Sequence, residues 1–282
     1  MKKVSRKMVQ LIRPGTLSAV ILMVLLLSGC SSIPQLTAQE EREHEQIVMI
    51  ESAEVDPEDS NPKKVPEPDS SFIPAERKPM VALTFDDGPF HYTDQILDIL
   101  EKYGVRATFF VVGKEIKGRE DSIIRAAQNG NEIAGHTWDH KRLTDLSNRE
   151  IAETIKKTSD LIEKVTGIPS PPFMRPTYGL VNARVANVCS ELGYTLINWT
   201  VDPQDWLLLN ANKVYDAVMR TVRENSIILL HELFATTVAA TERLIPALLE
   251  KGYEFVVLSE LMAYVYGELK PGRVYGSPGL VH

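Results

Sequence analysis

Two short stretches of the sequence carry residues that could do hydrolytic chemistry. The first, TFDDGP, places Asp86 and Asp87 side by side at the end of an apolar run. The second, GHTWDH, places His136 and His140 four residues apart, a spacing that can bring both rings to one side of a helical turn. Two histidines and one carboxylate supply nitrogen and oxygen donors that suit zinc or another divalent first-row metal. Each stretch alone is weak evidence for a functional site; Asp-Gly-Pro, for example, is a common turn sequence.

The two aspartates can have different roles. Neighbouring residues of an extended segment point to opposite sides, so we expect one carboxylate to ligate the metal. The other, turned aside, would act as a base on water that the metal activates. A divalent cation lowers the pKa of its bound water toward neutrality, to roughly 7 in favourable sites, and a single free carboxylate then completes the activation.

The elements that must position these residues alternate between strand and helix about seven times from position 79 onward. The predicted strands are 80–85, 106–113, 131–136, 173–176, 194–201, 226–232 and 253–261, and the predicted helices are 93–104, 121–130, 147–167, 182–193, 211–226 and 237–252. This alternation predicts an α/β fold with a parallel sheet and helices on its outside. Two arrangements fit: an open doubly wound sheet, and a barrel related to the eightfold type but short of one unit. In both, functional residues belong at the C-terminal ends of the strands.

Polar and aromatic residues lie at, or just after, the C-terminal ends of five of these predicted strands. They are Asp86 and Asp87; His136 and His140; Arg175 and Tyr178; Asp202, Asp205 and Trp206; and His231 and Glu232. Three of the six histidines of the chain fall in this set. The pattern therefore predicts one site at one rim of the sheet.

Five motifs of the chain resemble those of a known family. TFDDG, HTWDH, RPTYG, DPQDW and LLH occur in the order of the motifs of the NodB-homology polysaccharide deacetylases, carbohydrate esterase family 4. The resemblance extends over about residues 79–265. It implies a distorted (β/α) barrel with fewer than eight units, and a metal-dependent hydrolase that removes acetyl groups from N-acetylated sugars.

The resemblance also implies a role for each matching residue. The metal ligands would be Asp87, His136 and His140. The general base would be Asp86, oriented by Arg175. The general acid would be His231, beside an Asp205 that raises its pKa and favours the imidazolium.

Three further residues would shape the pocket. The backbone N–H of Tyr178 would donate to the oxyanion, while Trp206 and Leu229 would enclose the acetyl methyl group.

Two positions depart from the family pattern: Thr177 stands where a second proline is usual, and Glu232 stands where an aspartate is usual. The donor set suits zinc, and it also admits cobalt, nickel or manganese.

The sequence divides into four segments. Residues 1–29 have a basic start, an apolar run and a small-residue end, which are typical of an export signal. LSGC resembles the lipobox of bacterial lipoproteins, which implies cleavage before Cys30 and lipidation of its sulfur; an uncleaved signal anchor is the alternative. Residues 30–78 read as an acidic, proline-bearing, disordered spacer. A single domain over residues 79–265 and an irregular tail over residues 266–282 follow.

These observations favour one function and leave two alternatives. We expect an extracytoplasmic enzyme, anchored to the membrane by lipid, that deacetylates N-acetylglucosamine in a polysaccharide such as peptidoglycan or a chitin-like glycan. The alternatives are an O-acetyl xylan esterase on the same scaffold and a non-catalytic glycan-binding lipoprotein. The formal net charge of −7 and the lack of a basic cluster in the predicted domain, residues 79–265, argue against a nucleic-acid partner.

Overall fold

The computed structural model describes residues 78–276. The predicted export signal, Cys30, the spacer up to residue 77 and the last six residues lie outside the described part. Between residues 78 and 276, no helix combines the length and the hydrophobicity needed to cross a bilayer.

Eight parallel strands form one sheet in this part of the chain. They are β1 Met80–Asp86, β2 Thr108–Val111, β3 Glu132–Gly135, β4 Phe173–Met174, β5 Thr195–Ile197, β6 Ser226–His231, β7 Glu254–Phe255 and β8 Val274–Tyr275. Their order is β6-β1-β2-β3-β4-β5-β8, and β7 pairs with β1. Just after β5, Val201 forms a parallel bridge with Ile228 of β6, so the segment that leaves β5 returns to the first strand of this order and closes the sheet into a barrel. The predicted distorted barrel is confirmed, and the open doubly wound sheet is not.

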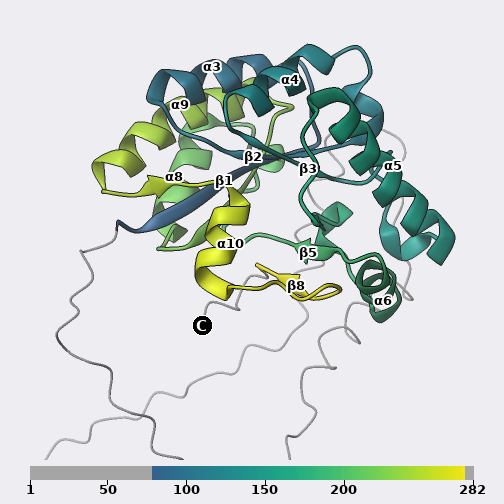
Figure 1. The fold of residues 1–282 in the computed structure, drawn as a ribbon. Coiled ribbons are helices and arrows are strands. Elements are labelled where there is room, and N and C mark those ends of the chain that lie inside the picture. Colours follow the sequence, from purple (N-terminus) through teal and green to yellow (C-terminus); the bar gives the residue numbers. More distant parts are fainter. Residues whose placement is uncertain (1–77, 277–282) are drawn as a thin grey trace, which may run out of the picture. The chain divides into compact units, whose positions relative to one another are not determined.

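The described residues also form eight α-helices, most of which lie on the outside of the barrel (Figure 1). They are α3 Thr93–Tyr103, α4 Glu120–Gln128, α5 Asn148–Thr166, α6 Ala183–Glu191, α7 Asp205–Leu208, α8 Ala211–Thr221, α9 Ala235–Glu250 and α10 Leu258–Tyr266. The ends of α5 follow from its sequence: Ser147 accepts the Glu150 N–H in a capping box, and Gly167 closes the helix in the left-handed conformation.

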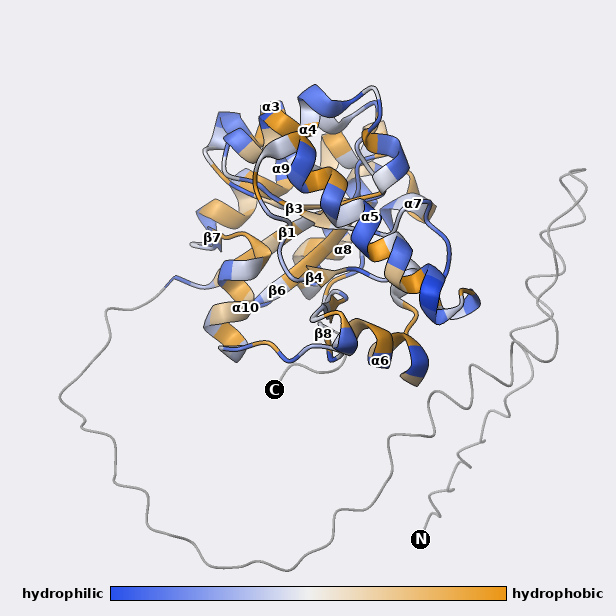
Figure 2. Ribbon diagram, turned by 45° about the vertical axis from the view of Figure 1, so that its right-hand side comes forward, coloured by the Kyte–Doolittle hydropathy of each residue, from blue (hydrophilic) through white to orange (hydrophobic). Residues whose placement is uncertain are grey.

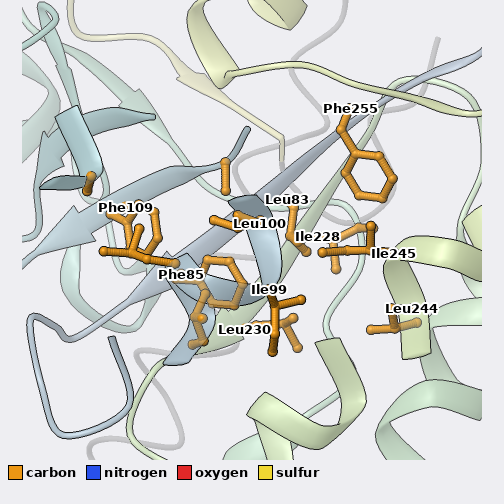
Figure 3. Close-up of a cluster of buried hydrophobic side chains, with 14 of the residues drawn as sticks. Leu83, Phe85, Ile99, Leu100, Phe109, Ile228, Leu230, Leu244, Ile245 and Phe255 are labelled. Atoms are coloured by element: carbon orange, nitrogen blue, oxygen red, sulfur yellow. The ribbon is translucent and has the colours of Figure 1, made fainter. Parts of the chain in front are cut away.

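Strand alternation separates two cores. The odd-numbered apolar residues of β1, Val81, Leu83 and Phe85, face outward and pack under the helices. The labelled residues of this outer core in Figure 3 are Leu83, Phe85, Ile99, Leu100, Phe109, Ile228, Leu230, Leu244, Ile245 and Phe255. Ala82 belongs to the core inside the barrel. Figure 2 shows the strands as hydrophobic, whereas helices such as α5 carry polar residues on one face. Thr84 and Asp86 therefore continue the inward-facing side of β1 toward the rim.

The end of the chain differs from the prediction in two ways. The apolar run predicted as a strand over 253–261 contains a short β7 and then α10, whose Leu258, Leu261 and Met262 are buried in the inner core. An apolar run of this length is compatible with a buried strand or a buried helix, so periodicity could not separate them. The described part of the supposedly irregular tail contains β8, which pairs with β5. Two residues are too few to show a strand pattern.

Candidate active site

The C-terminal ends of the barrel strands surround a cavity of about 440 Å³. Its walls are formed by Asp86, Asp87, His136, His140, Tyr178, Trp199, Asp202, Trp206, Leu229, His231, Leu233 and Phe234. Eight of the ten folded-domain site residues that the sequence predicted are in this set. The other two, Arg175 and Asp205, are fully buried and hydrogen-bond to members of it.

Asp86 and Asp87 both face the cavity, for a reason other than strand alternation. β1 ends at Asp86, and Asp87 has a left-handed backbone with φ of 75°. The turn brings its carboxylate back beside that of its neighbour: His136 Nε2 lies 3.8 Å from Asp86 Oδ2 and 3.5 Å from Asp87 Oδ1. The prediction that the two side chains diverge as in a strand was therefore wrong, although their surroundings do differ.

The two histidines lie in a loop and not on a helical turn. The loop after β3 has positive φ at Thr137 and at His140, and the Thr137 hydroxyl accepts the His140 N–H at 3.1 Å. His136 Nδ1 lies 2.8 Å from the carbonyl oxygen of Arg175. Because a carbonyl only accepts hydrogen bonds, Nδ1 carries the proton and Nε2 is free to ligate.

These three side chains fit a divalent cation. One ligand atom each from Asp87, His136 and His140 lie within 4.8 Å of one another. His140 Nε2 is 3.0 Å from Asp87 Oδ1, yet this buried oxygen accepts no well-formed hydrogen bond within the described part. A cation between the carboxylate and the two imidazoles would satisfy it, and two nitrogens with one oxygen are donors that zinc and its neighbours accept.

The electrostatic surroundings of these groups favour the protonation states that bind metal. Burial raises the pKa of Asp87, but His140 and the charges of His136 and His231 outweigh it and lower that pKa to about 2. Burial lowers the pKa of His136 below its ordinary value despite the two nearby carboxylates. A carboxylate and a neutral imidazole are the states that bind metal.

Asp86 is held by a buried guanidinium. Arg175 Nη1 donates to Asp86 Oδ1 at 2.6 Å and to the Thr84 hydroxyl at 2.8 Å, and its Nη2 and Nε donate to the carbonyls of Asn198 and Ile197. Its Cζ also lies 4.1 Å from the centroid of the Phe110 ring. Since only one Asp86 oxygen is bound in this way, the other faces His136 and the cavity.

His231, at the end of β6 beside β1, is paired with Asp205. The His231 ring Nδ1 lies 2.7 Å from Asp205 Oδ1, and its backbone N–H donates to Oδ2 of the same carboxylate at 2.8 Å. Burial lowers the pKa of His231, but the hydrogen bond and charge of Asp205, with the charges of Asp86 and Asp87, raise it to about 9. The ring is therefore an imidazolium at neutral pH and can donate a proton from Nε2.

Apolar and aromatic side chains complete the walls. Tyr178 has φ of 59°, and half or more of the side-chain surface of Tyr178 and Trp206 is exposed, while Leu229 is buried. Trp199, Leu233 and Phe234 also line the cavity and were not predicted. Leu233 and Phe234 come just after the predicted strand 226–232, and Trp199 lies near the end of the predicted strand 194–201; these positions were the available signal. Asp202 lines the cavity and also accepts the Gln204 N–H at 2.8 Å, so it closes a local turn as well.

The two departures from the family pattern lie under the site. Thr177 is fully buried, and its hydroxyl is 3.4 Å from that of Thr137. Glu232 is fully buried against Gly88 and accepts a hydrogen bond from the Thr93 hydroxyl. Burial, with the charges of nearby aspartates, raises the pKa of Glu232 to about 8, so this carboxyl is mostly neutral at pH 7.

Comparisons with known proteins agree with this geometry. The family model described as polysaccharide deacetylase matches residues 74–197. The chain is 39% identical over 183 residues to peptidoglycan-N-acetylmuramic acid deacetylase PdaC of Bacillus subtilis, which covers 64% of this chain and 38% of that protein. It is 37% identical over 189 residues to chitooligosaccharide deacetylase of Sinorhizobium fredii, which covers 62% of this chain and 88% of that one.

A solved structure matches over most of the same region. A family 4 acetyl xylan esterase from Clostridium thermocellum, in complex with a cobalt ion, has a TM-score of 0.66 and 33% identity. The match covers 71% of this chain and 100% of that one. In contrast, the chain spans about two fifths of the length of the Bacillus subtilis relative.

Proposed function

The chain belongs to the polysaccharide deacetylase family, and from that premise we propose that it is a metal-dependent hydrolase acting on an amide bond. It removes N-acetyl groups from N-acetylglucosamine residues of a cell-wall polysaccharide, which we take to be peptidoglycan. The observation that carries the proposal is the convergence of Asp86, Asp87, His136, His140 and His231 on one cavity. The names of two relatives, a peptidoglycan-N-acetylmuramic acid deacetylase and a chitooligosaccharide deacetylase, support deacetylation of a glycan. A peptidoglycan-N-acetylglucosamine deacetylase of Listeria monocytogenes, 38% identical over 215 residues, supports the choice of N-acetylglucosamine.

The metal would be held by Asp87, His136 and His140, and we propose zinc, with cobalt, nickel or manganese as alternatives. When bound, such a cation would polarise water and the acetyl carbonyl group. Asp86 accepts the proton of the attacking water. Arg175 supports this step because it fixes one carboxylate oxygen and leaves the other toward the cavity.

The neighbouring end of β6 protonates the leaving group. His231 gives its Nε2 proton to the glucosamine nitrogen as the carbon–nitrogen bond breaks, so the amine leaves neutral and acetate is the second product. Asp205 keeps the ring charged before this transfer. The backbone N–H of Tyr178 donates to the carbonyl oxygen as negative charge develops on it, and Trp206 and Leu229 enclose the acetyl methyl group.

Acetate release tests the proposal. The purified protein, supplied with zinc, should release acetate from peptidoglycan and from N-acetylated chito-oligosaccharides. Asp86→Asn should reduce the rate by at least about a hundredfold, since general acid–base groups contribute roughly that much or more. A matched control is Asp139→Asn, because this aspartate lies in the same motif as the histidines but pairs with Lys141, outside the cavity. Equal rates for the parent and Asp86→Asn would refute the proposed base.

An O-acetyl esterase is the second candidate, and the similarity to an acetyl xylan esterase favours it. Acetylated xylan should be assayed beside the chito-oligosaccharides at equal enzyme concentration. A kcat/KM higher on xylan than on every N-acetylated glycan would replace the main proposal. The third candidate, a non-catalytic glycan-binding lipoprotein, requires that no substrate is deacetylated although glycan binds.

We also propose that the protein acts outside the cytoplasm, held at the membrane by lipid on Cys30. The basis is the LSGC sequence after an apolar run, and two or more acyl chains would provide a lasting anchor. Cells that express the full chain should incorporate labelled palmitate into it and retain it in the membrane fraction. Cys30→Ala should lose the label; an unchanged label would exclude Cys30 as the site.

A further inference from the structure

The His231–Asp205 pair has a third member that the sequence did not indicate. Thr237 lies in the first turn of α9, is fully buried, and donates its hydroxyl to Asp205 Oδ2 at 2.7 Å. It is not among the residues that line the cavity. Any effect of this hydroxyl on the reaction must therefore pass through Asp205.

The Asp205 carboxylate is held at both oxygens. Oδ1 faces the ring of His231, while Oδ2 accepts the backbone N–H of His231 and the hydroxyl of Thr237. A carboxylate can rotate about its Cβ–Cγ bond, and rotation would move Oδ1 away from the imidazole. The Thr237 hydroxyl opposes this rotation from a helix that is packed into the barrel wall.

Among the helical threonines of the described chain, this contact has one counterpart, the hydrogen bond from Thr93 at the start of α3 to Glu232. Thr158, Thr166 and Thr221 each donate to the carbonyl four residues earlier in their own helix, which is the common local choice of such hydroxyls. Thr237 instead reaches a carboxylate 32 residues away in sequence. A hydrogen bond to a charged group is stronger than one to a backbone carbonyl, so the alternative partner is favoured.

We propose that Thr237 is a positioning residue for the general acid: its hydroxyl fixes the Asp205 carboxylate, which in turn holds the His231 ring with Nε2 toward the cavity. The inference rests on the proposed function for its catalytic consequence, but the positioning itself can be measured without activity.

Valine is the substitution that isolates the hydroxyl. Thr237→Val keeps the shape of the side chain and removes the donor. The chain offers a matched control in Thr241→Val, because Thr241 is one turn further along α9, is also fully buried, and has no hydrogen-bond partner within residues 78–276. Thr237→Ser restores the donor and serves as the rescue variant.

Two measurements decide the matter. In steady-state assays on an N-acetylated chito-oligosaccharide, Thr237→Val should lower kcat about tenfold with KM unchanged, which is the size expected for one hydrogen bond to a charged group. In proton NMR of the metal-free protein at pH 6, the Nδ1–H signal of His231, assigned by its absence in His231→Ala, should broaden or vanish through faster exchange. Thr237→Ser and Thr241→Val should match the parent in both measurements.

Three outcomes would overturn the inference. Parent-like kcat and an unchanged Nδ1–H signal in Thr237→Val would show that the hydroxyl does not position the pair. Equal losses in Thr237→Val and Thr241→Val would assign the effect to packing of α9. Failure of Thr237→Ser to restore the signal would exclude the hydroxyl. If the parent itself releases no acetate, the proposed function fails, and the NMR comparison still decides the role of Thr237.

Discussion

The two walls of the cavity place their reacting groups by different means. On the wall formed by the ends of β1 and β3, which we call the ligand wall, the backbone sets the directions of the side chains, because Asp87, Thr137 and His140 all have positive φ. On the neighbouring wall, which we call the acid wall, His231 is the last residue of a regular strand, β6, in register with Asp86 of β1. There a buried carboxylate from α7 and a hydroxyl from α9 orient the ring.

This difference separates the two kinds of chemistry. Left-handed backbone is costly for residues other than glycine, and it persists where the surrounding structure enforces it, so the ligand wall can hold three donors close together before a cation arrives. The acid wall uses a side-chain network and so can be altered one hydrogen bond at a time. Substitutions of the three metal ligands should change metal binding, and substitutions on the acid wall should change proton transfer alone.

The largest expected effect is the loss of a ligand. His136→Ala removes one of three donors, so we expect metal affinity to fall by at least about a hundredfold, more than a typical change around a ligand, and acetate release to fall below detection at limiting zinc. Calorimetric titration of the apoprotein measures the affinity. Asp86→Asn is the control, because it should bind metal and yet be inactive. Parent-like metal affinity in His136→Ala would show that the ligand set is wrong.

Much of the ligand wall could be predicted from the sequence, because the ends of parallel strands meet at one rim. Asp86, Asp87, His136 and His140 each follow such an end, so residue type and position located them. The direction of Asp87 could not be predicted, because it depends on a left-handed turn that a DDGP sequence permits but does not require. β8 was not predicted either, because its two residues become a strand only by pairing with β5.

The acid wall was predicted in part. His231 and Asp205 follow strands and share a family pattern, whereas Thr237 belongs to an apolar helix in which nothing in the local pattern distinguishes its hydroxyl from that of Thr241. Only the position of α9, which packs against α3 and α8, brings it to Asp205. Contacts between elements distant in sequence are the part of a site that a single sequence specifies least directly.

Removal of the acid should discriminate between substrates. His231→Ala should lower the rate on an N-acetylated chito-oligosaccharide by about a thousandfold, within the range for general acid catalysis. On 4-nitrophenyl acetate, whose leaving group needs no proton, the loss should stay below about tenfold. Zinc affinity should remain that of the parent. Equal losses on the two substrates would show that His231 acts on a step other than leaving-group protonation.

The third expected effect is a shift in pH dependence. Because the pKa of His231 is raised to about 9, the imidazolium persists at neutral pH, and activity should fall as the pH rises through about 9. The His231–Asp205 ion pair also stabilises the folded protein. Its contribution to the free energy of unfolding is complete below about pH 6.5, the ordinary pKa of histidine, and is lost as the pH rises through about 9.

Asp205→Asn removes the charge that sustains this shift. The pH at which kcat/KM falls on the basic side of its pH profile should move from about 9 down to about 6.5 or lower, because burial then lowers the pKa of His231 without the opposing carboxylate. At pH 8 the loss should be at least about tenfold, and near pH 6 it should be smaller. Asp202→Asn, which alters another carboxylate of the cavity, should move this pH much less. A fall that stays near pH 9 in Asp205→Asn would be assigned to another group.

The smallest effect is expected where the ligand wall meets the Tyr178 turn. The Thr177 hydroxyl is 3.4 Å from that of Thr137, which in turn accepts the His140 N–H. The turn has stronger supports: the Gly179 N–H donates to the Pro176 carbonyl at 2.9 Å, and Asn198 Nδ2 donates to the Gly179 carbonyl at 3.2 Å.

Thr177→Pro should therefore change kcat and KM by no more than about threefold, since a marginal hydrogen bond between neutral groups contributes little. Pro176 has ψ of 140°, which suits a following proline, and Thr177 already has helical dihedral angles. Thr177→Val separates loss of the hydroxyl from the added rigidity of the ring. A loss above about tenfold in both variants, with weaker zinc binding, would mean that this hydroxyl holds the His140 loop in place. The ligand wall would then depend on side-chain hydrogen bonds as the acid wall does, and the contrast between the two walls would not stand.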